Sequence, residues 1–77
     1  MTLSELYKGN KAKILDFMPE VSPTQREWAM NMGLYSGNEI CCYRQENFQS
    51  PAIYQIGNFS LAIDRDITSK ILISQID

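Results

Sequence analysis

The chain has 77 residues, seven Lys and Arg against nine Asp and Glu, a formal net charge of −2 and no histidine. This length allows one domain, which we expect to span residues 1–77, and the composition is that of an ordinary globular protein. The slightly acidic balance argues against nucleic-acid binding, because no cationic surface is expected to neutralise phosphates. Without histidine, the chain lacks the commonest general base and the commonest metal ligand.

The two cysteines, Cys41 and Cys42, are adjacent, which is not the spacing of a zinc site or of a redox Cys-x-x-Cys motif. We expect two reduced thiols on a strand, one pointing inward and the other outward. A single outward thiolate does not make a metal site, so we predict neither a metal site nor a cofactor.

The hydropathy pattern contains no membrane span. The longest unbroken apolar run covers residues 40–43, whereas a span needs about 20 residues. The N-terminal residues also lack the basic region and the apolar core of a signal peptide. We therefore expect a cytoplasmic protein that is not embedded in a membrane.

Turn residues and hydrophobic periodicity divide the chain into short elements, most of them strands. In chain order, the predicted elements are a helical turn at residues 2–6, a strand at 11–18, a helix at 23–32, strands at 39–44, 52–56 and 59–63, a short turn at 64–69 and a strand at 70–76. In the first strand, Ala12 and Ile14 alternate with lysines. Leu15 and Phe17 then interrupt this alternation, which predicts a twist, a bulge or cover on both faces.

The predicted helix has clear boundaries. Ser22 and Pro23 are typical of a helix start, and Gly33 is typical of the left-handed residue that ends one. The expected core contacts of this helix are Ala29, Met30 and Met32.

Tight glycine turns connect the remaining strands. Gly37 stands at the third position of the turn at residues 35–38, which predicts a type II turn. Gly57 opens a two-residue hairpin turn. Five short strands joined in this way favour a mainly β fold, a small closed barrel with one helix after the first strand.

Many of these positions together resemble a known family. The residues that carry the resemblance are Ser22, Pro23, Arg26, Ala29, Met30, Met32, Gly33, Leu34, Gly37, Ile40, Ile56, residues 61–63 and residues 71–73. The most specific piece, Met-Gly-Leu-Tyr-Ser-Gly at residues 32–37, matches a helix-end pattern Leu-Gly-Leu-x-x-Gly. Over nearly its whole length the chain resembles the ferrous iron transport protein A family.

The resemblance implies a five-stranded SH3-like β-barrel and a cytoplasmic accessory protein, not an enzyme. Its implied partner is the cytosolic domain of the membrane ferrous iron transporter, which includes a nucleotide-hydrolysing domain. The chain departs from the family pattern at three places: Gln-Ser-Pro at residues 49–51 replaces the usual Gly-Asp-Pro, and Trp28 and Asp64 replace residues that are often basic.

The expected contact surface for this partner consists of Trp28, Leu34 and Tyr35, with Arg26 at its rim. Trp28 either folds over the barrel as part of the core or serves as a partly exposed anchor, since tryptophan is enriched in interface hot spots. Arg26 either meets an acidic partner or forms a surface ion pair with Glu20 or Glu27.

Two alternatives concern metal. Asp64 and Asp66 are closely spaced carboxylates, and a helix cap formed by Asp64 competes with a metal site that would need more oxygen ligands. The same barrel also occurs as the C-terminal domain of bacterial metal-dependent repressors. The alternative function is therefore a metal-responsive regulatory module that binds a transition metal or a transcription factor. Catalysis is not expected, because no serine or threonine has a histidine partner.

Overall fold

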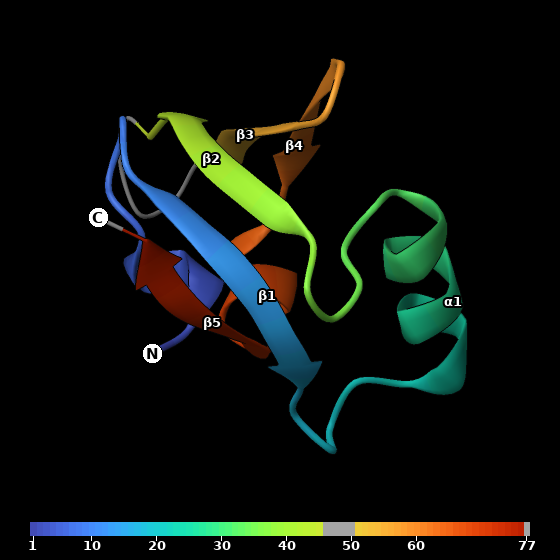
Figure 1. The fold of residues 1–77 in the computed structure, drawn as a ribbon. Helices are drawn as coiled ribbons and strands as arrows, with labels where there is room; N and C mark the ends of the chain where they lie inside the picture. Colours follow the sequence, from blue (N-terminus) through green and yellow to red (C-terminus); the bar gives the residue numbers. More distant parts are fainter. Residues whose placement is uncertain (46–50, 77) are drawn as a thin grey trace.

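A computed structural model describes residues 1–45 and 51–76. Its elements, in chain order, are the 3₁₀ turn η1 (Leu3–Glu5), β1 (Lys11–Phe17), α1 (Pro23–Asn31), β2 (Glu39–Arg44), β3 (Ala52–Ile56), β4 (Phe59–Ile63), α2 (Arg65–Thr68) and β5 (Ile71–Ile76), as Figure 1 shows. The predicted order of elements is confirmed, and the predicted boundaries agree to within one or two residues. Most of the polar loop predicted at residues 45–51, including the first two residues of Gln-Ser-Pro, lies outside the described residues.

The five strands form one antiparallel sheet in the order β4-β3-β2-β1-β5, which curls around the core. The predicted mainly β class is confirmed, but the predicted closure by strand pairing is wrong. Within the part of the chain that the structure describes, no ladder joins β4 to β5. The N-terminal residues instead run along the outer edge of β5: Thr2 forms a bridge with Leu72, and the Ile73 amide donates to the Met1 carbonyl at 2.9 Å.

Strand β1 contains the irregularity that its sequence predicts. Its pairing with β5 shifts register between Ile14 and Asp16, so one residue of β1 has no partner across the ladder. The bulge turns Leu15 outward, where it is 49% exposed, and returns Phe17 to the buried face.

Tyr54 of β3 is the largest of the fully buried side chains. Its hydroxyl donates to the Leu3 carbonyl at 3.4 Å and so ties η1 to the sheet. Burial, and to a smaller extent the neighbouring Cys42 thiol, raises the pKa of Tyr54 to about 12.

The predicted split of the cysteines is confirmed, because Cys42 is buried and Cys41 is partly exposed, and both are free. Burial raises the pKa of the Cys42 thiol.

Candidate partner-binding surface at helix α1

Helix α1 begins as its sequence predicts. The Ser22 hydroxyl accepts a hydrogen bond from the Gln25 amide at 3.1 Å, and the Gln25 side chain accepts one from the Ser22 amide at 3.3 Å. This reciprocal pair satisfies amide groups that the first turn of a helix leaves without partners. Pro23 occupies the first helical position, where its missing N–H costs nothing. The helix therefore starts at a fixed point, with five residues between it and the end of β1.

The C-terminal end of α1 is fixed equally well. The Gly33 amide donates to the Met30 carbonyl at 3.1 Å, and the Leu34 amide donates to the Ala29 carbonyl at 2.9 Å. These two bonds form a Schellman motif, in which the residue after the helix adopts a left-handed conformation. Gly33 has a φ of 99°, and Leu34, which follows it, is completely buried. The predicted helix end at Gly33 is confirmed.

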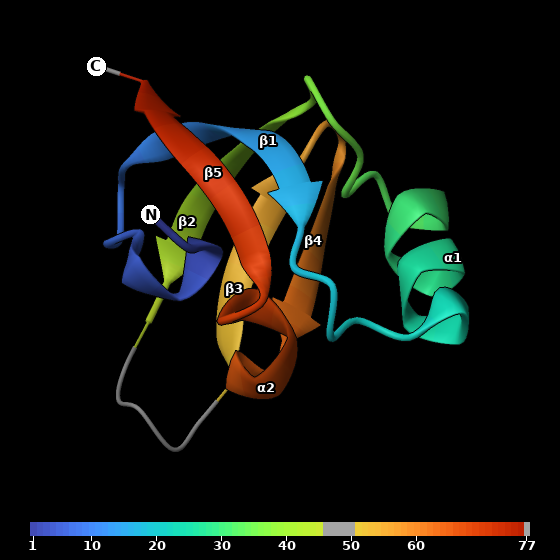
Figure 2. The same ribbon diagram turned by 90° about the horizontal axis from the view of Figure 1, so that it is seen from below.

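Gly33 also touches the sheet. A β-carbon added there would lie 2.7 Å from Cγ2 of Ile56, and the Asn38 side-chain amide donates to the Gly33 carbonyl at 2.6 Å. The backbone of Gly33 therefore packs directly against β3. This contact holds the end of α1 against the sheet, while the helix itself stands to one side of the strands (Figures 1 and 2).

Arg26 forms a second link between α1 and the sheet. Its Nη2 donates to the Met18 carbonyl at 3.2 Å, and its guanidinium lies 5.4 Å from the centroid of the Phe17 ring. Phe17 is the last residue of β1, and Met18 follows it directly. In place of the expected surface ion pair with Glu20 or Glu27, the structure shows a partly exposed cation that stacks on an aromatic ring.

The apolar residues of α1 do not share one face, because consecutive helical residues point about 100° apart. Ala29 is buried along the line of contact, and Trp28 and Met30 flank it on opposite sides. Trp28 is partly exposed and packs against the core. Met30 is 52% exposed and Met32 is only partly buried, so the expectation that both contribute to the core is wrong.

The four residues of the expected contact surface divide into two groups. Trp28, Arg26 and Tyr35 retain exposed surface, and Tyr35 is 47% exposed. Leu34 is completely buried, so the expectation that its side chain contacts a partner is wrong. Sequence reasoning missed Met30 as a surface residue. The available signal was the run Trp-Ala-Met, since three consecutive residues cannot all face the core.

Among the described residues, Asp64 forms no side-chain helix cap, and Asp64 and Asp66 belong to no cluster of metal ligands. Asp64 is the N-cap residue of α2 by position, and its main-chain carbonyl accepts from the amides of Ile67 and Thr68, both at 3.0 Å. Its carboxylate makes no capping bond, so that part of the expectation is wrong. Over residues 1–45 and 51–76, no three His, Cys, Asp or Glu side chains gather as metal ligands.

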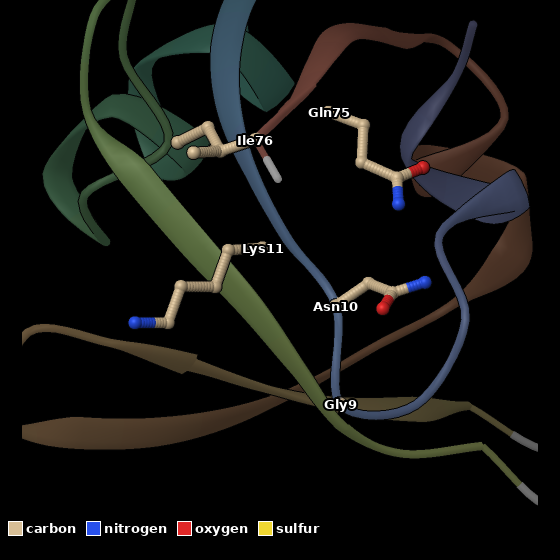
Figure 3. A pocket seen from close by; sticks show the side chains of 5 residues that line it. All are labelled: Gly9, Asn10, Lys11, Gln75 and Ile76. Carbon is tan, nitrogen blue, oxygen red and sulfur yellow. The ribbon is translucent and has the colours of Figure 1, made fainter.

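An open pocket of about 320 Å³ lies where β1 begins and β5 ends, lined by Gly9, Asn10, Lys11, Gln75 and Ile76. Figure 3 shows the side chains of Asn10 and Gln75 on one side of β1 and those of Lys11 and Ile76 on the other. The two amide groups thus share one side of the pocket, and the lysine points away from them. The start of β1 and the end of β5, which line this pocket, lie away from α1 (Figure 1), so the pocket is separate from the surface described above.

None of the helices in the described part of the chain has the length and apolar character to cross a membrane.

Comparison with known proteins identifies the family. The model of the FeoA domain matches residues 1–75. A crystal structure of an iron uptake regulatory protein, FeoA, superposes with a TM-score of 0.88 at 21% identity, covering 99% of this chain and 97% of the other. Iron(II) transport protein A from Clostridium thermocellum gives a TM-score of 0.87 at 28% identity; the match covers 99% of this chain and 46% of that one, so this chain spans about half of it.

A third structure, FeoA from Stenotrophomonas maltophilia complexed with zinc, gives a TM-score of 0.80 at 19% identity, covering 96% of this chain and 89% of the other. That protein is described as a prokaryotic SH3 domain protein and as a candidate ferrous iron transport activating factor. No curated protein sequence matches the chain. The match over residues 1–75 places the chain in the FeoA family, whose small accessory proteins are implicated in ferrous iron transport.

Proposed function

We propose that this chain is a cytoplasmic accessory protein that binds the cytosolic domain of the membrane ferrous iron transporter and modulates transport. Membership of the FeoA family supports the link to ferrous iron. The similar structures include an iron uptake regulatory protein and a candidate transport activating factor, and both descriptions fit a protein that acts on a transporter.

The observation that carries the proposal is a set of exposed apolar side chains on and after α1, which we call the α1 surface: Trp28 on one side of the buried Ala29, Met30 on the other, and Tyr35 in the turn that follows the helix. Two of these side chains are about half exposed, and Trp28 is partly so. Aromatic residues supply much of the binding energy in protein interfaces, because they bury a large area at a small cost in side-chain entropy. The Ser22 cap and the contact of Gly33 with Ile56 hold this surface in place before binding.

Arg26 belongs to the same surface as a support. Its contacts with Met18 and Phe17 fix the first half of α1 against the end of β1. Leu34 anchors the start of the turn that presents Tyr35, since its side chain is completely buried in the core. In the proposed complex, Trp28 and Tyr35 make direct contact, while Arg26 and Leu34 hold them in position.

The test is binding of the purified chain to the cytosolic domain of the transporter, measured by calorimetry with and without nucleotide. We expect Tyr35→Ala and Met30→Ala each to weaken binding by about fivefold, and Trp28→Ala by about thirtyfold, as for truncation at an interface hot spot. Tyr7→Ala serves as the matched control, because Tyr7 is 73% exposed and lies away from α1. Tyr7 precedes the start of β1, whereas α1 follows the end of that strand.

Trp28 also packs on the core, so its variant must be shown to be folded, by amide dispersion in a two-dimensional NMR spectrum. Met30 and Tyr35 provide variants without this complication, since their side chains are about half exposed. A folded Trp28→Ala protein that binds as tightly as the wild type, together with no effect of Met30→Ala or Tyr35→Ala, would exclude the α1 surface.

A further inference from the structure

The two edges of the sheet differ in how they are covered. Along β5, the Ile73 amide bonds to the Met1 carbonyl and Leu72 bridges to Thr2, so the N-terminal residues occupy that edge. At the opposite edge lies β4, whose one strand partner among residues 1–45 and 51–76 is β3. A strand edge without a partner presents main-chain donors and acceptors that can pair with another chain.

The register of the β3–β4 hairpin identifies the groups concerned. Ile56 and Phe59 close the two-residue turn, and Tyr54 pairs with Leu61. In an antiparallel ladder, alternate residues bond to the partner strand, so the main-chain groups of Ser60 and Ala62 point away from β3. Both residues are exposed, and within residues 1–45 and 51–76 no backbone hydrogen bond reaches these groups.

Strand β4 also lacks three of the features by which proteins usually protect an edge: a charge, a proline and a bulge. Its sequence, Phe-Ser-Leu-Ala-Ile, contains no charge and no proline, and its register against β3 runs without a bulge. Phe59, at the start of the strand, is 44% exposed. These properties suit a strand that receives a partner strand through main-chain hydrogen bonds.

The charges beside β4 indicate the chemistry of that partner. Asp64 follows the strand directly, and Asp66 lies in the first turn of α2; both are exposed. Arg65 between them is partly buried, and its charge acts on the Tyr54 hydroxyl inside the fold. In an antiparallel arrangement, the N-terminal end of an added strand lies beside these two carboxylates. Opposite charge at that position favours the complex and sets its direction.

We propose that the free edge of β4 binds an extended segment of the partner protein, uncharged where it pairs with β4 and preceded by basic residues that face Asp64 and Asp66. The inference rests on the proposed function, because it names the kind of transporter segment that the chain recognises. Alternate side chains of the segment lie beside Phe59 and Leu61, and the others lie on the outer face beside Ser60 and Ala62.

The first experiment uses a synthetic probe, acetyl-RKSVTVSG-amide, with two controls: EE in place of RK, and RK moved to the C-terminal end. Binding to the wild-type chain is measured by calorimetry and by NMR shift mapping. We expect the probe to bind with shifts centred on β4, and each control to bind about fivefold more weakly. Equal binding of all three peptides, or shifts centred elsewhere, would overturn the proposal.

The second experiment tests the hydrogen bonds and the charge. Ala62→Pro removes the outward amide and leaves the β3 ladder intact, so we expect about tenfold weaker binding. N-methylating alternate amides of the probe makes the same test on the unaltered chain: one set must abolish binding and the other must not. The wild type is expected to prefer the RK probe to the EE control, and Asp64→Lys is expected to reverse this preference. The same charge change at Glu39 on β2, Glu39→Lys, is expected to leave the preference for the RK probe unchanged.

The same variants are then measured against the transporter's cytosolic domain. If that domain binds the wild type and the edge variants equally well, the edge proposal fails and the proposed function stands. If the domain does not bind the wild type, the proposed function fails, and the probe peptides still decide whether the edge of β4 recognises a basic, extended segment.

Discussion

Among single residues, Tyr54 gives the clearest coupling between burial and stability. Its pKa is raised to about 12, first by burial and then by Cys42, whereas the ordinary value is 10.0. The native state therefore holds this proton more tightly than the unfolded chain does. The resulting stability is fully present below about pH 10 and is lost as the pH rises toward 12, by at most roughly 2–3 kcal/mol.

The prediction is tested by urea unfolding at intervals from pH 9 to pH 12. We expect the wild type to lose free energy of unfolding more steeply than Tyr54→Phe, which has no proton to release at this position. Because all other titrating groups are common to both proteins, the difference between the two curves isolates Tyr54. Parallel curves over this range would contradict the predicted coupling.

Single residues also show where sequence reasoning ends. For Trp28 the sequence left a core position and a partly exposed anchor open, and the structure shows a side chain that packs on the core and keeps exposed area, while Tyr35 is about half exposed. Whether they bind a partner stays a prediction. The burial of Leu34 was predictable, since the residue after a helix-ending glycine often makes an apolar contact with the last turn of the helix. The stacking of Arg26 on Phe17 was not predictable, because it depends on where the end of β1 passes the helix. Only tertiary packing determines that distance.

At the scale of elements, the junction between α1 and β3 depends on Gly33. An alanine there would have to adopt a φ of 99° and would place its β-carbon 2.7 Å from Ile56. Gly37 offers a matched control, since its φ is 92° but nothing lies within 4 Å of the added carbon. Both substitutions carry the cost of a left-handed backbone, about 1–2 kcal/mol, and only Gly33→Ala also displaces the strand.

We therefore expect Gly33→Ala to lower the free energy of unfolding by about 1–3 kcal/mol more than Gly37→Ala does. The measurement is chemical unfolding of the two variants beside the wild type. Hydrogen exchange at α1 and β3 amides gives the second readout, because a displaced helix end should exchange faster. Equal losses in the two variants would show that the contact with Ile56 carries no cost.

Local signals predicted most of the elements. The Ser-Pro start, the Gly33 end and the two-residue hairpin turn all depend on short-range sterics, so they can be read from a few residues. The exact place of the bulge in β1 could not be read from nearby residues in this way. There, Ile14 bonds through its main chain to Gly37 and Asn38, which lie far along the sequence. Long-range partners of this kind fix the register, and no local pattern encodes them.

At the scale of the whole molecule, the N-terminal residues cover the β5 edge of the sheet, and among the described residues no fifth ladder closes the sheet by joining β4 to β5. Strand periodicity predicted the strands correctly but could not show how the edges are covered, because a main-chain bridge such as that between Thr2 and Leu72 leaves no pattern in the side chains. The leucines of η1 and of its C-cap were the available signal. Leu3 and Leu6 are both completely buried.

This arrangement makes the stability of the whole fold depend on Leu3. A domain of this size is expected to have a free energy of unfolding of roughly 5–10 kcal/mol. Leu3→Ala removes a fully buried side chain from the residue whose carbonyl accepts from the Tyr54 hydroxyl, so we expect a loss of about 3 kcal/mol and a fall in Tm of at least about 10 °C. Leu15→Ala is the matched control, because Leu15 is half exposed on the bulge and should cost under about 0.5 kcal/mol. Thermal unfolding of both variants decides the point: similar Tm values would mean that the N-terminal residues lie on the barrel without completing its core.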